Sequence, residues 1–460
     1  MTTIAAISTP PGSGGIAIIR LSGPAAHTLA RRVFRPWPAA PRYFHLYLGY
    51  IHEPDSGSRL DQVFLALMPE NRSYTREAMA EIHCHGGEYV TRRILNLLFT
   101  LGAEPAAAGE FTRRAYLNGR LDLAQAEAVA GLIAAESEAG LKAAASQLAG
   151  GLSDYLAELL AGLEKVLAGV EVAIDLLAEE GGNYRPANLM AELAGLAGAG
   201  QRLCDSYRRG RFFQAGLKVV LAGRPNVGKS SILNALLAED RALVSTVAGT
   251  TRDVVSAFVE IAGVRIELSD TAGLDTPRDE LEALGMARTE KWLKQADLVL
   301  LVLDASRPLA DRDLELYRRL QDRPRRLVLN KQDLGCRLDE EEIRKRFGYD
   351  GPLLKCIGIR EEPEIDEVVA GIAGFIESRR PEEDAAPLIT RRRHYELLSN
   401  FVAAVELARE LAAAGPEPPL DLLADELHQA RRALLQITGA ENEAAESLLD
   451  KVFNGFCVGK

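Results

Sequence analysis

The pattern of apolar and polar residues over the first 118 positions predicts a compact domain of strands and helices. Short apolar runs such as Gly15–Leu21 and Val63–Met68 are separated by turns rich in Gly and Pro. Runs of this length, bounded by turn residues, are typical of β-strands. We therefore predict an α/β domain over residues 1–118.

Beyond this domain, apolar residues recur at helical spacing. The stretch Leu121–Ala178 is rich in Ala, Leu and Glu and contains no proline. A second helical run follows the break at Gly181–Pro186 and continues to about Phe213, and helical texture returns from Arg391 to Phe456 after a polar linker. This periodicity predicts amphipathic helices on both sides of a central segment.

The central segment alternates short apolar strands with helices. The strands are expected at Lys218–Ala222, Val264–Leu268, Leu298–Asp304 and Arg326–Leu329, and the segment ends near Arg379. Such alternation implies right-handed βαβ crossovers and a mostly parallel sheet with helices on both faces.

The predicted fold class is a multidomain α/β plus all-α protein, because 460 residues exceed what one hydrophobic core supports. The simplest interpretation inserts the central α/β domain into one helical domain, while two unrelated helical segments would give the same pattern. The predicted domains are residues 1–118 (α/β), 119–215 (helical, first part), 216–379 (α/β with a mostly parallel sheet) and 380–460 (helical, second part).

Composition narrows the class of protein. Hydrophobic residues make up 47% and charged residues 26%, and no segment approaches the ~20 apolar residues of a membrane-spanning helix. The N-terminal residues lack the pattern of a signal peptide. Five scattered cysteines without a Cys-x-x-Cys pair disfavour disulfides and structural zinc. We expect a cytoplasmic protein with no membrane association.

The net charge of −11 and a pI near 5.4 indicate that the protein as a whole repels nucleic acid. Any contact with RNA must therefore use a local basic patch. Arg208–Arg211 and Arg391–Arg393 are the candidates, although solvated helix faces explain such runs more often.

A phosphate-binding motif, Gly-x-x-x-x-Gly-Lys-Ser, occupies Gly223–Ser230 between a predicted strand and the helix predicted at Ser231–Leu237. Glycines let the backbone N–H groups surround phosphates, and the helix N-terminus adds partial positive charge. Lys229 can reach the β- and γ-phosphates, and the Ser230 hydroxyl can bind Mg²⁺.

Two further motifs fit a phosphate site. Asp270–Gly273 follows the second strand, so Asp270 can hold Mg²⁺ through water and the Gly273 amide can sense the γ-phosphate. Thr250–Asp253 lies between the two motifs, where a mobile switch would supply a threonine to the Mg²⁺ shell.

The motif Asn330–Asp333 predicts guanine as the base. The Asp333 carboxylate can accept hydrogen bonds from guanine N1 and its 2-amino group, and adenine lacks these donors. A site built around such polar contacts discriminates strongly between bases.

One residue departs from the Ras pattern. Leu274 stands where Ras-like proteins carry the glutamine that orients the attacking water. Either hydrolysis is slow or another residue supplies this function. Arg252 as an arginine finger and Arg252 as a surface residue are both open.

With these motifs placed, the whole chain resembles the MnmE (TrmE) family of tRNA modification GTPases. A generic GTPase would share only the nucleotide motifs, whereas this resemblance extends to both ends. The motifs that carry it are Thr9–Gly15, His85–Gly87, Gly109–Thr112, Leu121–Ala128, Gly249–Asp253 and Phe456–Lys460.

The resemblance implies a G domain inserted in a helical domain, and an N-terminal domain that dimerises and binds 5-formyltetrahydrofolate. It also implies K⁺-dependent GTP hydrolysis as two G domains pair. With the flavoprotein MnmG, in a heterotetramer, such proteins add an aminomethyl-type group, often carboxymethylaminomethyl, to C5 of the wobble uridine of certain tRNAs.

The resemblance also assigns residues around the nucleotide. Glu282 matches the family's water-orienting glutamate, which would resolve the departure at Leu274. Mg²⁺ would be held by Ser230 and Thr251, and K⁺ by Asn226, Ser245, Val247 and Thr250. The GTP contacts would be Asn226, Val227, Gly228, Lys229, Ser230, Ser231, Ser245, Thr246, Val247, Ala248, Gly249, Thr250, Thr251, Asp270, Thr271, Ala272, Gly273, Asn330, Lys331, Gln332 and Asp333.

For the folate, the resemblance assigns Arg20, Glu81, Arg120 and Lys460. An arginine suits the folate carboxylates, and a carboxylate suits the N–H edge of the pterin. The thiol of Cys457 would lie near the modification site.

Two segments fit less simply. Cys356–Arg360 stands where the family usually closes the guanine pocket with a Ser-Ala-type motif. His83-Cys84-His85 resembles a metal site, but alternate residues of a strand point to opposite faces, so a structural role is favoured.

Two other functions fit the sequence less well. A ribosome-assembly or regulatory GTPase would act only as a binding switch, but such proteins usually carry a basic RNA-binding module, and none is evident. A folate-dependent transferase with a vestigial G domain conflicts with the intact phosphate and guanine motifs.

Overall fold

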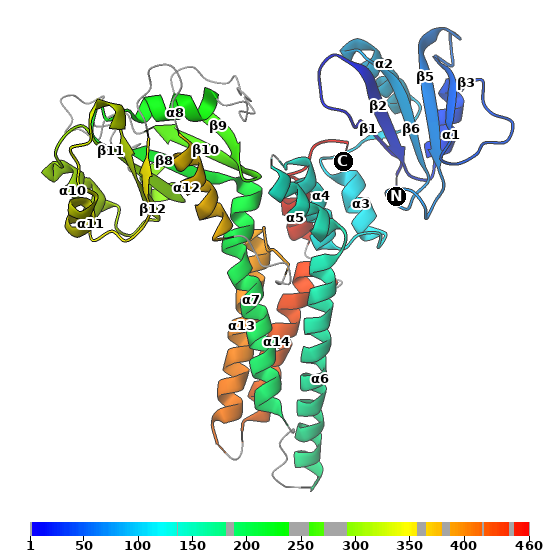
Figure 1. Ribbon diagram of the computed structural model, residues 1–460. Coiled ribbons are helices and arrows are strands. Elements are labelled where there is room, and N and C mark those ends of the chain that lie inside the picture. Colours follow the sequence, from blue (N-terminus) through cyan, green and yellow to red (C-terminus); the bar gives the residue numbers. More distant parts are fainter. Residues whose placement is uncertain are drawn as a thin grey trace, which may run out of the picture. The chain divides into compact units, whose positions relative to one another are not determined.

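The computed structural model describes residues 2–135, 137–180, 188–238, 257–270, 292–356, 365–379, 387–415, 418–440 and 446–459. The chain forms two compact units (Figure 1). Unit 1 comprises residues 1–134, 145–201 and 396–460, and unit 2 comprises residues 135–144 and 202–395.

Unit 1 begins with a seven-stranded sheet of order β3-β4-β5-β6-β2-β1-β7. Its pairs are antiparallel except for β1 with β7. The elements are β1 (Ile4–Ile7), β2 (Gly14–Ser22), α1 (Ala26–Val33), β3 (Phe34–Arg35), β4 (Leu46–His52), β5 (Arg59–Met68), β6 (Met79–Gly86), α2 (Glu88–Thr100), β7 (Glu104–Pro105) and α3 (Glu110–Leu117).

Alternation along the strands gives this sheet two different faces. One set of side chains, including Ile19, Leu65 and Ile82, is fully buried in a core shared with α1 and α2. The residues between them in sequence, including Arg20 and Phe64, lie on the opposite face. Side chains on that second face, called the open face below, are therefore not covered by α1 and α2.

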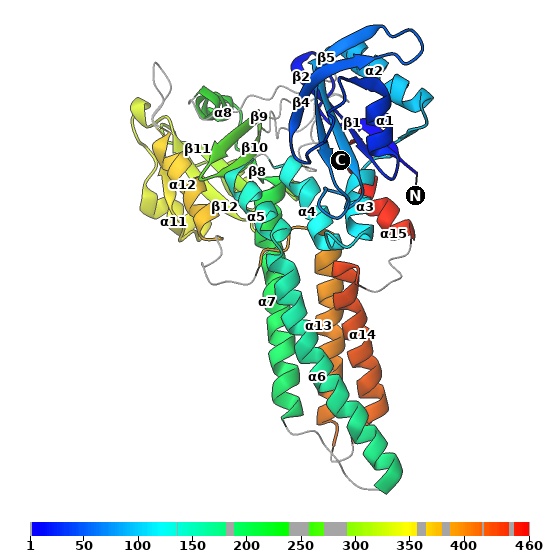
Figure 2. The same ribbon diagram turned by 90° about the vertical axis from the view of Figure 1, so that its right-hand side faces the viewer.

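The rest of unit 1 is helical. Its elements are α4 (Leu123–Ile133), the end of α5 (Glu138–Leu148), α6 (Gly151–Glu180), the start of α7 (Leu189–Ala215), most of α13 (Arg392–Ala413), α14 (Leu420–Thr438) and α15 (Glu446–Phe453). In both views α6, α7, α13 and α14 run side by side as a bundle (Figures 1 and 2).

The bundle follows from the spacing of its apolar residues. Leu163, Val170 and Leu427 are fully buried, and Arg431 of α14 pairs with Glu164 of α6 at 3.0 Å. The proline-free stretch 121–178 forms three helices rather than one, because α4 ends at Ile133, α5 begins at Glu138, and the chain turns at Gly150, whose φ is +101°.

Unit 2 contains a six-stranded sheet of order β13-β12-β11-β8-β10-β9, in which only β9 runs antiparallel to its neighbour. The elements are β8 (Leu217–Ala222), α8 (Lys229–Ala238), β9 (Ala257–Ile261), β10 (Val264–Asp270), β11 (Leu298–Asp304), α10 (Asp311–Arg319), β12 (Arg325–Asn330), η1 (Gln332–Leu334), α11 (Glu340–Phe347), β13 (Leu353–Lys355) and α12 (Asp366–Glu377).

Two apolar cores cover this sheet. Helices α8 and α12 pack on one face, and α10 and α11 pack on the other. Every residue of β11 is buried, as expected for a central parallel strand covered on both sides. The predicted fold class, α/β domains combined with helices and a mostly parallel sheet, is confirmed. No helix in the described ranges is long and apolar enough to cross a bilayer.

Candidate functional site

The phosphate motif forms the turn between β8 and α8, as the sequence predicts. Its glycines are required by geometry. Gly223 has φ +151°, and a Cβ there would lie 2.5 Å from the carbonyl oxygen of Val302. Gly228 has φ +96°, and a Cβ there would overlap Nδ2 of Asn330. Both positions combine a left-handed backbone with a close neighbour, so they exclude side chains.

Two cationic side chains hold the loop. Lys229 is buried, and its Nζ donates to the carbonyls of Gly223 at 3.0 Å and Arg224 at 2.9 Å. Arg224 in turn donates from Nε to Oδ1 of the buried Asp313 in α10, at 2.7 Å. The sequence analysis did not single out Asp313, although an arginine inside the phosphate motif signals a need for an acidic partner.

The guanine motif lies beside the phosphate loop. Asn330 ends β12, and its Nδ2 donates to the Val227 carbonyl at 2.8 Å. Lys331 donates from Nζ to the Asn226 carbonyl at 2.5 Å. Two motifs about 100 residues apart in sequence are thus joined by direct hydrogen bonds.

Asp333, the predicted base-reading residue, lies in the short helix η1, directly after these contacts, and is exposed. Cys356 is fully buried, and its N–H donates to the Leu329 carbonyl at 2.9 Å. Burial, together with the negative charge of Asp333, raises the pKa of the Cys356 thiol to about 11. The thiol therefore stays protonated and packs behind the predicted base site.

Several predicted nucleotide residues fall outside the described ranges. Asp270 is described only by its backbone, which pairs with Leu221 of β8 and so ends β10 next to the strand that leads into the phosphate loop. The residues singled out in the sequence that lie outside the described ranges are Ser245, Thr246, Val247, Ala248, Gly249, Thr250, Thr251, Arg252, Thr271, Ala272, Gly273, Leu274, Glu282 and residues 357–360.

A second polar cluster lies on the open face of the N-terminal sheet. Arg20 and Glu81 are register partners on β2 and β6, and their Nη2 and Oε1 atoms lie 2.9 Å apart. Burial raises the pKa of the Glu81 carboxyl, but His83 and the Arg20 guanidinium lower it more, so the pKa lies below its ordinary value. Glu81 is thus an ionised acceptor at neutral pH.

Tyr74 connects this ion pair to Arg120. The Arg20 and Arg120 guanidinium carbons lie 5.8 Å and 4.7 Å from the Tyr74 ring centre. Arg120 also donates to the Tyr74 carbonyl at 2.8 Å, and the Tyr74 hydroxyl bonds Thr112 at 2.9 Å. The structure therefore brings together the predicted Arg20, Glu81 and Arg120, and it adds Tyr74, which the sequence analysis missed.

The C-terminal segment reaches the same cluster. Val458 forms a β-bridge with Ala108, and Arg20 donates from Nη1 to the Gly459 carbonyl at 3.3 Å. Cys457 is exposed, and its carbonyl accepts from the Gly109 N–H at 3.4 Å. Lys460 lies outside the described residues.

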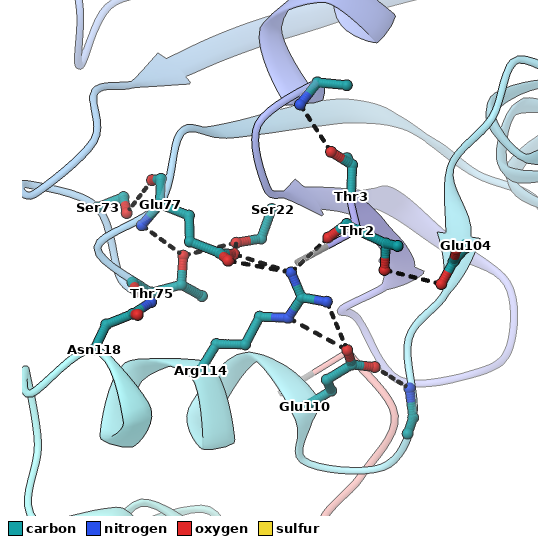
Figure 3. A network of polar contacts seen from close by, with 12 residues as sticks. Thr2, Thr3, Ser22, Ser73, Thr75, Glu77, Glu104, Glu110, Arg114 and Asn118 are labelled. Atoms are coloured by element: carbon teal, nitrogen blue, oxygen red, sulfur yellow. Dashed lines mark hydrogen bonds and ion pairs between the residues drawn. The ribbon is translucent and has the colours of Figure 1, made fainter.

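A buried ionic network fixes α3 beside this cluster (Figure 3). Arg114 is 6% exposed and pairs with Glu77 at 3.1 Å and Glu110 at 2.8 Å, and it donates to the Thr2 carbonyl at 2.8 Å. Because α3 also carries Thr112, this network sets where Tyr74 is held.

The His83-Cys84-His85 motif does not converge on one point. Cys84 faces the core, where its thiol donates to the Ala17 carbonyl, while His85 is 69% exposed and bonds Asp61 at 2.6 Å. Burial and the charge of Asp61 raise the pKa of the Cys84 thiol to about 11. Among the described residues no group of three or more His, Cys, Asp or Glu side chains suited to a metal ion occurs.

The two basic runs of the sequence belong to neighbouring segments of unit 2. Tyr207 and Tyr395 stack with ring centres 4.6 Å apart, and Ser206 Oγ accepts from the Ile389 N–H at 3.0 Å. Residues 208–211 and 391–393 therefore approach one another. An RNA contact there stays a prediction.

Comparisons with known proteins cover nearly the whole chain. Residues 3–120 match the family described as GTP-binding protein TrmE N-terminus, and residues 123–457 match the MnmE helical domain. The solved structure of Era from Aquifex aeolicus bound to GDP and AlF4⁻ is 27% identical, covering 41% of this chain and 67% of that chain. Its TM-score of 0.29 is too low to bear on the fold.

Similar curated proteins align end to end. The tRNA modification GTPase MnmE of Moorella thermoacetica is 42% identical, with 100% of this chain and 99% of the relative covered. The proteins of the same name from Natranaerobius thermophilus and Lactiplantibacillus plantarum are 38% and 40% identical, with 100% of this chain and 99% and 98% of the relatives covered. Family matches over both ends and full-length relatives agree, and the chain belongs to the MnmE family of tRNA modification GTPases.

Proposed function

We propose that this protein binds and hydrolyses GTP and that it acts in tRNA modification. The proposal of nucleotide binding rests on two hydrogen bonds. Asn330 donates to the Val227 carbonyl, and Lys331 donates to the Asn226 carbonyl. These contacts support the proposal that Asp333 reads the base of a nucleotide whose phosphates lie in the loop. The family match carries the tRNA part.

Mg²⁺ and K⁺ are the proposed cofactors of hydrolysis. Ser230 lies in the first turn of α8 and Asn226 lies at the exposed tip of the loop, with φ +62°. Their side-chain oxygens are of the kind that hard cations prefer, so both residues fit. When bound, the cations would offset charge on the phosphate oxygens. The other proposed ligands, Ser245, Val247, Thr250 and Thr251, lie outside the described residues.

The N-terminal cluster is the proposed site for 5-formyltetrahydrofolate. Arg20 and Arg120 offer guanidinium groups to carboxylates, and Glu81 offers an ionised carboxylate to the N–H edge of a pterin. Tyr74, whose ring lies near both arginines, offers an aromatic ring to the same ligand. The residues present therefore fit this class of ligand.

The open sheet face supports a homodimer. Leu46, Leu48 and Phe64 are 52%, 58% and 44% exposed, and Leu48 lies opposite Phe64 across β4 and β5. Large apolar side chains gathered on one exposed sheet face mark an interaction surface. A second copy of this chain is the proposed occupant.

The proposed reaction adds an aminomethyl-type group, including carboxymethylaminomethyl, to C5 of wobble uridines with the flavoprotein MnmG. Mass analysis of tRNA nucleosides from cells lacking this protein tests it, and loss of the modified wobble uridine is expected. Unchanged nucleosides would refute the tRNA function.

Measurements on the purified Glu282→Ala variant separate nucleotide binding from GTP turnover. We expect intact GTP affinity and at least about tenfold lower hydrolysis, or about 1.4 kcal/mol in the barrier. Equal turnover would remove Glu282 from the proposed mechanism.

A further inference from the structure

Asp304 lies next to the nucleotide motifs without belonging to any of them. It ends the central strand β11 in register with Asn330 of β12, and only 5% of its surface is exposed. Its Oδ1 accepts from the N–H and hydroxyl of Ser306, at 3.1 Å and 2.6 Å. Its Oδ2 accepts from Lys331 Nζ at 2.8 Å. Both carboxylate oxygens of Asp304 therefore accept hydrogen bonds within the protein.

Lys331 joins Asp304 to the phosphate loop. The same Nζ donates to the Asn226 carbonyl at 2.5 Å, so one ammonium bridges a carboxylate and a backbone oxygen. Lys331 has φ +65°, a conformation that residues with a side chain rarely adopt. Strained backbone of this kind persists where surrounding contacts impose it and clusters at functional sites.

The Asp304 end of the bridge is shielded from water, whereas the Lys331 side chain is 25% exposed. Burial raises the pKa of the Asp304 carboxyl, but hydrogen bonds from Lys331 and Ser306 lower it more, so the pKa lies below its ordinary value. An ionised carboxylate beside an ammonium in a poorly solvated place attracts it more than the same pair in water. Arg307, 73% exposed and 3.9 Å from Oδ2, is too solvated to replace Lys331.

We propose that Asp304 is a positioning residue for guanine-nucleotide binding, which holds the Lys331 ammonium against the Asn226 carbonyl and so locks the guanine motif to the phosphate loop. This inference rests on the proposed nucleotide function. Asp304 touches neither base nor phosphate in this scheme and acts only through Lys331.

A double-mutant cycle on GDP affinity tests the inference, with fluorescent GDP binding to the full chain as the readout. Asp304→Asn keeps the shape but removes the charge, and Lys331→Met removes the ammonium. We expect each single variant to weaken GDP binding about tenfold. If Asp304 acts through Lys331, the double variant binds as weakly as Lys331→Met alone. Losses that multiply to about a hundredfold would overturn the proposal.

Asp297→Asn is the matched control. Asp297 precedes the same strand, accepts from the Lys218 N–H at 3.0 Å, and lies roughly 23 Å from Asp304 along β11. We expect unchanged GDP affinity for this variant; a tenfold loss would mean that any change at β11 disturbs binding and would overturn the specific role.

Ser306→Ala covers the case in which Asp304→Asn fails to fold. It removes the hydroxyl that orients Asp304 and leaves the charge in place. A loss of GDP affinity that disappears in the Lys331→Met background supports the inference, and a loss that persists there overturns it. A wild-type chain that binds no GDP would instead refute the proposed nucleotide function itself.

Discussion

Asp333 follows Asn330 and Lys331 immediately, and those two residues already hold the phosphate loop. These hydrogen bonds hold the backbone that carries Asp333 beside the phosphate loop. A preorganised acceptor of this kind loses little entropy when the base binds. Selectivity for the base is therefore expected to depend on this single side chain.

Asp333→Asn should shift preference from guanine toward xanthine nucleotides. The amide offers a donor where the carboxylate offered an acceptor, and xanthine has a carbonyl in place of the guanine 2-amino group. Competition binding of GTP and XTP measures the change. Asp339→Asn is the control, because exposed Asp339 only caps α11 through the Glu341 N–H. Retained GTP preference in Asp333→Asn would refute the base contact.

Glu81→Gln should alter how stability depends on pH. The folded-state pKa of Glu81 lies below its ordinary value of 4.5, so its ionised form contributes stability at higher pH. That contribution disappears as pH falls through the lowered pKa. In thermal unfolding from pH 7 to pH 3, the gap between wild type and Glu81→Gln should narrow below about pH 4.5. A gap independent of pH would exclude this role.

The roles of some single residues can be predicted from the sequence, and those of others cannot. Glycines at 223 and 228 are predictable, because a phosphate loop requires positive φ and close backbone approach. Tyr74 and Asp304 were not predicted, because their roles depend on partners far away in sequence, such as Arg20 and Lys331. Arg20, Glu81 and Arg120 were assigned by family resemblance, and no property of an isolated arginine would have selected them.

At the scale of elements, buried strands were predicted most accurately. The prediction for Leu298–Asp304 matches β11, and the other three central strands are longer than predicted by one or two residues. Continuous apolar runs define such strands well, because both faces are covered. Helix ends in Leu121–Ala178 were not predicted, because the turn at Gly150 depends on tertiary packing rather than on a proline.

The helix α3 depends on one buried arginine. Arg114 pairs with Glu77 and Glu110, whose side chains are 12% and 22% exposed. We expect Arg114→Met to lower the free energy of unfolding of unit 1 by roughly 3–5 kcal/mol, because it leaves buried carboxylates unpaired. Urea unfolding monitors this change.

Arg113→Met provides the comparison for Arg114→Met. Arg113 is the adjacent residue, but it pairs with the half-exposed Asp450 at 3.3 Å. A surface pair of this kind contributes about 1 kcal/mol or less. Equal losses in the two variants would show that the buried network has no special role.

At the scale of the whole molecule, the open sheet face predicts self-association. Leu48→Glu should convert the proposed dimer to monomer, because it places a charge among Leu46 and Phe64. Sedimentation equilibrium measures the association. Leu422→Glu on α14 is the control, since Leu422 is similarly exposed at 55% but lies on the helical bundle. A Leu48→Glu protein that still dimerises would place the interface elsewhere.

The contact of Val458 and Gly459 with Ala108 and Arg20 has a consequence for biosynthesis. The strands that carry Arg20 and Glu81 leave the ribosome hundreds of residues before Gly459 is made, so the proposed folate site gains its contact with Gly459 only at the end of synthesis. Fragments interrupted anywhere in the intervening chain would lack this contact. If the proposed ligand depends on it, only chains that reach residue 459 would retain the ligand.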